Sequence, residues 1–129
     1  MVAETDLARM LASLDVQQRG GRFTFVTGDW PALRTVAHAI VDEEEGRTYV
    51  VKVEDAVAVG APVGFVAAWL TLRVWSSLES VGLTAAVSSA LAGEGISCNT
   101  IAGYHHDHLL VPIDRADDAI RVLRTLSSQ

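Results

Sequence analysis

The C-terminal half of the chain changes clearly between the two-residue period of a strand and the 3.6-residue period of a helix. From 66 to 74 the even positions are all apolar, while the odd positions mix alanine, tryptophan, threonine and arginine. This pattern predicts a strand with one uniform apolar face and one mixed face. Apolar residues then recur at helical spacing from 81 to 93, and Gly93 and Gly95 follow. The spacing predicts a helix that these glycines terminate.

Two further strands and a helix are predicted after this first helix. Residues 96–104 and 108–113 are the predicted strands, and a turn at 105–107 joins them. Asp114 can cap a final helix, whose apolar residues fall at i, i+3, i+4 and i+7 from Ala116. The order β-α-β-β-α is the ferredoxin-like plan without its last strand.

The first sixty residues give a weaker pattern. Apolar residues at i, i+3, i+4 and i+7 from Leu7 predict a helix that Thr5 can cap. Gly20 and Gly21 are expected to end the linker that follows, and the acidic segment 42–47 is expected to be a solvated hairpin turn. The strands predicted in this half are 22–27, 33–41 and 48–53.

The segment 57–64 is the predicted seam of the molecule, because it contains two glycines and a proline. It divides an N-terminal half, 1–62, from a C-terminal half, 63–129. The C-terminal half lacks a fourth strand, which would leave an exposed sheet edge. We expect the N-terminal half to supply that strand through residues 22–27, so that both halves form one cooperative unit.

Composition and charge exclude several classes of protein. Of the 129 residues, 50% are hydrophobic and 20% are charged, which is a globular composition. The net charge of −6 argues against nucleic acid or an anionic membrane surface as a partner. A single cysteine, Cys98, excludes an internal disulfide and favours a reduced, cytoplasmic setting. No membrane span or signal peptide is expected from the hydropathy pattern.

Three segments of the C-terminal half carry a family resemblance. They are LTLRVWSSLESVGLTAAV at 70–87, ALAGEGISCN at 90–99 and AGYHHDHLLVP at 102–112. They resemble the ACT-domain superfamily and, more narrowly, its bacterial branch of small stand-alone proteins with tandem ACT-like halves. Trp75 stands where histidine is common in that branch, and His105 where tyrosine is common. The first sixty residues share only the layout of that branch.

The resemblance implies an α+β, ferredoxin-like fold (βαββαβ) in which two ACT-like halves share strands. It implies a non-catalytic regulatory protein that binds a small ligand, most often an amino acid, without a cofactor. ACT units often associate, so a homodimer is a further expectation. In this family the ligand lies at an interface between ACT units, against the first strand-to-helix loop and a second strand. The alternative function is a structural or protein-interaction module with a vestigial pocket.

The strand-to-helix turn at 76–84 is the expected ligand site. Unpaired amides and the helix dipole suit a carboxylate there, and Gly82 has no Cβ to keep a ligand from the backbone. Glu79 would repel that carboxylate unless it points away or binds the ligand's amine. In the second strand, the amide of Asn99 can bind an amino or carboxyl group. The expected ligand-binding residues are Ser76, Ser77, Leu78, Val81, Gly82, Leu83, Thr84, Asn99, Ile101 and Ala102.

Structural explanations for the same residues stay open. Ser80 can simply cap the helix, Gly82 can allow close helix packing, and Asn99 can bond its own backbone. Trp69 and Trp75 on the mixed strand face need a cover. We expect the N-terminal half to provide it, with a homodimer interface as the alternative.

The sequence His105-His106-Asp107-His108 contains residue types that bind metals, but its spacing is that of a tight hairpin. Adjacent side chains diverge in a hairpin, so we expect no metal site there. Asp107 is expected to form the turn, and one histidine to hydrogen-bond across the hairpin. A metal-dependent hydrolase built on this turn is the last alternative function.

No catalytic motif stands out in the chain. Ser76 and Ser77 are not in a G-x-S-x-G elbow, and Gly20-Gly21 lacks the lysine and serine of a P-loop. Cys98 is expected to be a small core residue. The sequence therefore predicts a protein that is not an enzyme.

Overall fold

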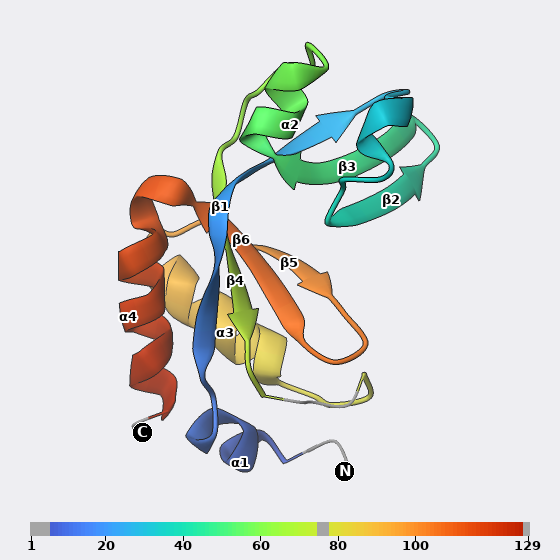
Figure 1. Ribbon diagram of the computed structural model, residues 1–129. Coiled ribbons are helices and arrows are strands. Elements are labelled where there is room, and N and C mark those ends of the chain that lie inside the picture. Colours follow the sequence, from blue (N-terminus) through green and yellow to red (C-terminus); the bar gives the residue numbers. More distant parts are fainter. Residues whose placement is uncertain (1–5, 75–77, 128–129) are drawn as a thin grey trace. The chain divides into compact units, whose positions relative to one another are not determined.

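The computed structural model describes residues 6–74 and 78–127 (Figure 1). By contacts between residues the chain divides into two compact units, which we call unit 1 (Met1–Gly20 and Ala68–Gln129) and unit 2 (Gly21–Ala67). The domain boundary expected at 62 and 63 stays a prediction. The helices and strands are α1 (Leu7–Ala12), β1 (Val16–Thr27), β2 (Ala39–Glu43), β3 (Gly46–Lys52), α2 (Val53–Ala58), β4 (Ala67–Leu72), α3 (Leu83–Gly93), β5 (Asn99–Ala102), β6 (Asp107–Pro112) and α4 (Ala116–Ser127).

Unit 1 has the ferredoxin-like plan that the sequence predicted. Its strands lie in the order β1-β4-β6-β5, and the chain runs β4-α3-β5-β6-α4. Strands β5 and β6 form an antiparallel hairpin in which Asn99 is opposite Leu110 and Ala102 is opposite Asp107. Strand β1 takes the place of the missing fourth strand, next to β4. The prediction that the N-terminal half supplies this strand is therefore confirmed.

The prediction that residues 22–27 fill that place was wrong. Strand β1 has 12 residues, and the part that belongs to unit 1 ends at Gly20. The predicted segment is the other end of the same strand, where Phe23 to Thr27 pair with β3. Gly20 and Gly21 lie inside β1 and do not end a linker.

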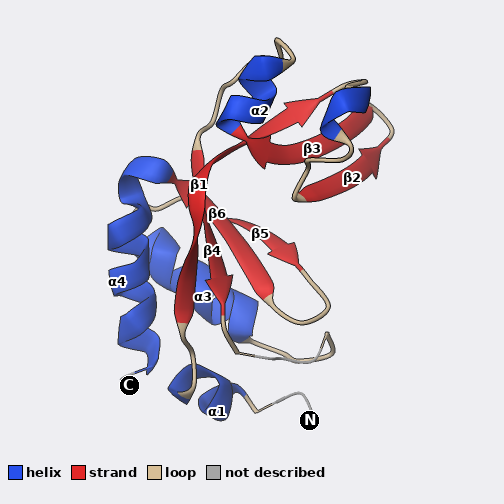
Figure 2. Ribbon diagram, in the orientation of Figure 1, coloured by secondary structure: helices blue, strands red, loops and turns tan. Residues whose placement is uncertain are grey.

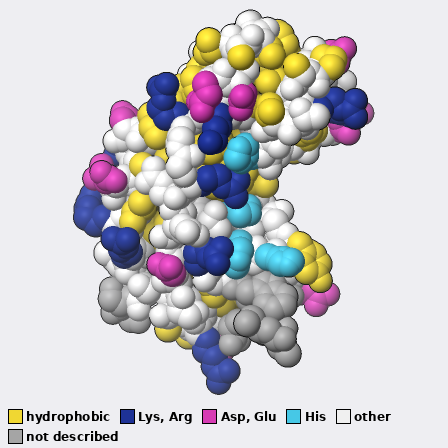
Figure 3. Space-filling model, in the orientation of Figure 1, with side chains coloured by type: hydrophobic (Ala, Val, Ile, Leu, Met, Phe, Trp, Pro, Cys, Tyr) yellow, Lys and Arg dark blue, Asp and Glu magenta, His cyan; other side chains and the backbone are white. Residues whose placement is uncertain are grey.

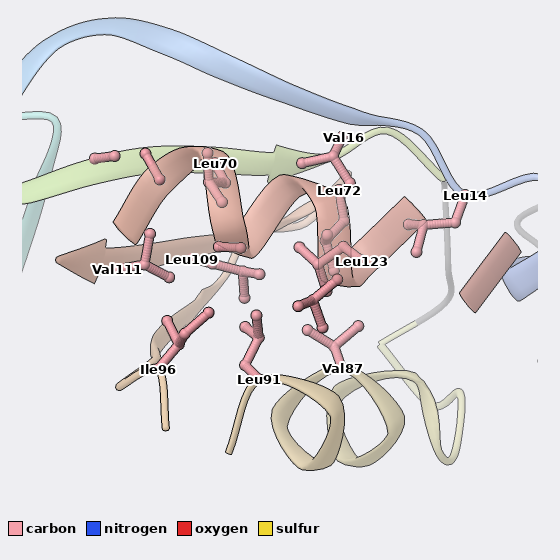
Figure 4. Close-up of a cluster of buried hydrophobic side chains, with 14 of the residues drawn as sticks. Leu14, Val16, Leu70, Leu72, Val87, Leu91, Ile96, Leu109, Val111 and Leu123 are labelled. Carbon is pink, nitrogen blue, oxygen red and sulfur yellow. The ribbon is translucent and has the colours of Figure 1, made fainter. Parts of the chain in front are cut away.

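The core of unit 1 lies between one face of the sheet and helices α3 and α4 (Figure 2). The even positions of β4, among them Leu70 and Leu72, are buried there together with Leu109 and Val111 of β6. Figure 4 shows these side chains facing Val87 and Leu91 of α3 and Leu123 of α4. The helical residues recur every three to four positions, which places them on one face. Each such leucine stabilises the fold by about 1.5–3 kcal/mol when its burial is complete.

Helix α1 is the first element of unit 1 along the chain. Its N-cap is Asp6, whose side chain accepts a hydrogen bond from the backbone N–H of Arg9 at 3.0 Å. The expected cap, Thr5, lies outside the described residues. Helix α1 ends at Ala12, so Leu14 is buried beyond the helix and not within it. Asp6 fits this role because its short carboxylate reaches the orphan amides of the first turn.

Unit 2 is a three-stranded antiparallel sheet in the order β2-β3-β1, with helix α2 packed against it. Its core contains Val26, Leu33, Tyr49, Val51, Ala56 and Ala61. Strands β2 and β3 form the predicted hairpin, and the exposed Glu44 and Glu45 are at its tip. The Tyr49 hydroxyl accepts a hydrogen bond from the backbone N–H of Trp30 at 3.3 Å, which ties the β1–β2 connection to the core.

The structure of unit 2 differs from the sequence analysis at two places. The strand expected at 33–41 starts only at Ala39, because Pro31–Leu33 form a short 3-10 helix that buries Leu33. Helix α2 was not predicted; it begins at Val53, before the predicted seam at 57–64, with two acidic residues in its first turn. In the described parts of the chain, no helix is both long enough and apolar enough to cross a membrane.

Candidate functional site

The corner between β4 and α3 is shaped by Gly82, the N-cap of α3. Its φ of 103° lies in the left-handed region that side chains with a Cβ rarely adopt. Its carbonyl oxygen accepts the first hydrogen bond of the helix, from the N–H of Ala86 at 2.9 Å. As a glycine, it brings no side chain to cap the next amides. The N-cap is thus Gly82 and not Ser80, and the backbone conformation requires glycine.

The space left by the missing Cβ of Gly82 is occupied by the protein itself. A Cβ built there would lie 3.0 Å from the Cδ2 atom of Leu7, in helix α1. The sequence predicts that this space admits a ligand. Leu7 takes it instead, so the alternative explanation of Gly82, close packing against a helix, describes this side of the residue.

A small cavity nevertheless borders the same corner on another side. Its volume is about 170 Å³, and it lies between the start of α3 and the connection of β5 to β6. Among the residues expected to bind a ligand, those that line it are Leu78, Gly82, Leu83, Thr84 and Ala102. Val81 is 81% exposed, Asn99 is exposed and Ile101 is half-buried, and none of these three lines the cavity. Ser76 and Ser77 lie outside the described residues.

The cavity contains one acidic residue that sequence reasoning had assigned to a turn. Asp107 is the first residue of β6, where it pairs with Ala102, and its side chain lines the cavity together with Ser80 and Gly103. Burial raises the pKa of the Asp107 carboxyl, and the nearby His106 opposes this. Glu79, whose charge could repel a ligand carboxylate, is exposed and does not line the cavity.

Strand alternation explains why Asp107 and the histidines on either side of it lie on opposite faces of the sheet. Successive side chains of a strand point to opposite faces of the sheet. His106 and His108 therefore share one face, and Asp107 points to the other, where α3 begins. The alternation His-Asp-His was visible in the sequence and would have placed Asp107 at the corner, had β6 been predicted to begin at 107 and not at 108.

The histidines of this turn have separate partners. The Nδ1 atom of His108 accepts a hydrogen bond from Nε1–H of Trp69 at 3.2 Å and lies 3.0 Å from the Thr71 hydroxyl. The expected bond across the hairpin is thus made to the neighbouring strand β4 instead. His105 packs its ring on Tyr104 with centroids 5.1 Å apart. Within 6–74 and 78–127, no three metal-ligating side chains come together.

Trp69 is covered from within unit 1. Its side chain is 2% exposed, the Arg19 guanidinium lies 4.1 Å from its ring centroid, and the His108 ring lies at 5.3 Å. Arg19 belongs to the N-terminal half, so the expected cover is confirmed for this tryptophan. Trp75 lies outside the described residues. Cys98 is half-buried against the core just before β5, and burial raises the pKa of its thiol.

Comparisons with known proteins agree with this architecture. ACT-domain family models match residues 2–68 and residues 65–125. A crystal structure of a Vibrio cholerae protein of unknown function, described as a possible transport protein, is 35% identical, with a TM-score of 0.84 over 94% of this chain and 95% of that one. No protein of curated function matches the chain.

More distant structures share the fold. The ligand-free regulatory subunit of aspartate kinase from Thermus thermophilus has a TM-score of 0.62 at 12% identity, over 86% of this chain and 95% of that one. Escherichia coli aspartokinase III, solved in complex with aspartate and ADP, has a TM-score of 0.61 at 12% identity, over 90% of this chain and 33% of that one. The matches of both family models, together with a 35% identical relative over nearly the whole length, show that this chain belongs to the ACT-domain family.

Proposed function

We propose that this protein is a regulatory sensor that binds an amino acid in the cavity between α3 and the β5–β6 connection. Membership of the ACT family supports a small-ligand regulatory role in general. The finer proposal rests on one observation: the start of a helix and a half-buried carboxylate both line the same cavity of about 170 Å³.

These two features match the two charges of an amino acid. The N-terminus of α3 carries partial positive charge and amides that the helix itself does not use, which suits a carboxylate. Asp107 suits the ammonium group, because a cation beside a half-buried carboxylate offsets its desolvation cost. Leu78 and Ala102 supply apolar contact for a short side chain.

A binding screen with one matched pair of variants tests this proposal. Thermal unfolding is followed with each of the twenty amino acids, and a ligand at a hundredfold its Kd adds about 2.7 kcal/mol of stability. Asp107→Asn should weaken binding about 10- to 100-fold, since a charge-assisted hydrogen bond contributes about 1.5–3 kcal/mol. Asp117→Asn, which removes the same charge from an exposed position in α4, should bind within twofold of the natural chain.

The proposal fails if no amino acid changes the unfolding temperature. It also fails if Asp107→Asn and Asp117→Asn bind with equal affinity, because the cavity would then not contain the ligand's ammonium group.

One observation favours a second candidate, an interaction module. Three large apolar side chains stand exposed near the cavity: Leu78 at 66%, Val81 at 81% and Tyr104 at 72%. Exposed apolar side chains that together form one patch usually mark a contact surface. A second copy of the chain seated on them would form the homodimer that the family resemblance implies, and would cover the cavity.

Sedimentation analysis tests the homodimer. Val81→Glu should convert a dimer to a monomer, whereas Val57→Glu, at a position in unit 2 that is 63% exposed, should leave the mass unchanged. A natural chain that sediments as a monomer at high concentration would rule the homodimer out.

A further inference from the structure

A second, larger hollow lies on the opposite face of the unit 1 sheet. Its volume is about 420 Å³, and it is lined by residues from β1, β4, β6 and their flanks. Figure 3 shows arginine or lysine and histidine side chains side by side on this surface. We call it the basic groove, after its two lining arginines, Arg19 and Arg73; His106 and His108 also line it.

The charge of this groove contrasts with that of the chain. The chain has a net charge of −6, yet none of the described residues that line the groove is aspartate or glutamate. Asp107 lies between two groove histidines in the sequence, but it lines the cavity on the other face. Strand alternation thus separates a basic face from an acidic cavity within three consecutive residues.

Two side chains of the groove, those of Arg19 and His108, are held in place by a ring contact and a hydrogen bond. The guanidinium of Arg19 lies on the ring of Trp69 at 4.1 Å, and Trp69 donates its Nε1–H to His108. The Nδ1 atom of His108 must then keep its lone pair, so this histidine is neutral and Arg19 and Arg73 supply the fixed positive charge. Burial and the charges of Arg19 and His106 lower the pKa of His108 in agreement. A guanidinium fixed in this way loses little entropy on binding an anion.

We propose that the basic groove is a binding site for a small organic dianion, whose charged groups are phosphate or carboxylate. Two guanidinium groups match a charge of −2, and their planar forks match the oxygens of either group. Gln17 and Gln18 add amide groups that can bind the uncharged part of such a molecule. The volume is within the range of small-molecule sites and exceeds that of the corner cavity. This site is separate from the amino-acid cavity and does not depend on it.

Tryptophan fluorescence supplies the test, because Trp69 lies beneath Arg19. The full chain is titrated with inorganic phosphate, adenosine monophosphate and succinate at constant ionic strength, with neutral adenosine as the uncharged comparison. Saturable changes with phosphate and adenosine monophosphate alone would identify a phosphate site, and with succinate alone a dicarboxylate site. No saturable change with any dianion in the natural chain, or equal binding of adenosine, would overturn the proposal.

Matched variants locate the site. Arg73→Gln should weaken dianion binding about tenfold or more, whereas Arg34→Gln, which removes the same charge from an exposed position in unit 2, should change it less than twofold. Gln18→Glu, an isosteric change at an exposed position, should also weaken binding and requires no refolding of the core. Equal affinity in Arg73→Gln, Gln18→Glu and Arg34→Gln would overturn the proposal. The amino-acid proposal is tested with Asp107→Asn and this one with Arg73→Gln and Gln18→Glu, so failure of the one and failure of the other give different results.

Discussion

Replacing Gly82 by alanine should destabilise unit 1 for two separable reasons. The φ of 103° is a conformation that costs a residue with a Cβ about 1–3 kcal/mol. The new Cβ would also lie 3.0 Å from Cδ2 of Leu7, which must rotate away at a cost of about 0.5–1.5 kcal/mol. Together these terms predict a loss of about 1.5–4.5 kcal/mol in the free energy of unfolding, large against the usual 5–15 kcal/mol of a domain.

Urea unfolding followed by far-ultraviolet circular dichroism measures this loss. The signal reports mainly on unit 1, because the two longest helices, α3 and α4, belong to it. Gly93→Ala is the matched control, since Gly93 ends the same helix without a positive φ and a Cβ there would meet nothing within 4 Å. That change should stabilise the protein by about 0.5–1 kcal/mol.

A double-mutant cycle with Leu7→Ala separates the two terms. Removing the Leu7 side chain eliminates the steric overlap but leaves the backbone strain, so Gly82→Ala should cost about 0.5–1.5 kcal/mol less in the Leu7→Ala background. If Gly82→Ala is as stable as the natural chain, or if its cost is the same with and without Leu7, the account of this corner is refuted.

Three further predictions follow from the β5–β6 region. The folded state lowers the pKa of His108, so the unfolded chain binds the proton more readily. The stability should therefore be constant above about pH 7 and should fall as the pH drops below about 6.5. Urea midpoints across this range should depend less on pH in His108→Asn, but not in His105→Asn. The folded state raises the pKa of Asp107, because burial makes its carboxylate less stable than in the unfolded chain. Asp107→Asn should therefore raise the unfolding temperature at pH 7, and a lowered value would contradict the assignment. Gly103→Ala places a Cβ 2.8 Å from the backbone oxygen of His106 and should cost about 1–3 kcal/mol in urea unfolding, whereas Gly64→Ala meets nothing within 4 Å and should not.

The elements with strong periodicity were predictable from the sequence. The alternation at β4, the helical spacing of α3 and α4, and the acidic tip of the β2–β3 hairpin are all local patterns, and the structure has each of these elements. The need for an extra strand was also predictable, because a sheet with an exposed edge is rarely left uncovered. Family membership followed from the motifs of the C-terminal half.

The features that define the candidate sites depend on partners distant in the sequence. Residues 16–21 contain mostly polar residues and glycine, and they form a strand only because β4 provides hydrogen bonds along it. Leu7 fills the space at Gly82, and Arg19 covers Trp69, through contacts that no local pattern encodes. The sequence thus determined the strands and helices of unit 1 from β4 to α4, since periodicity is a local property. Only the tertiary structure decided which side chains meet at each face of the sheet, because strand pairing and register are set by packing across the whole unit.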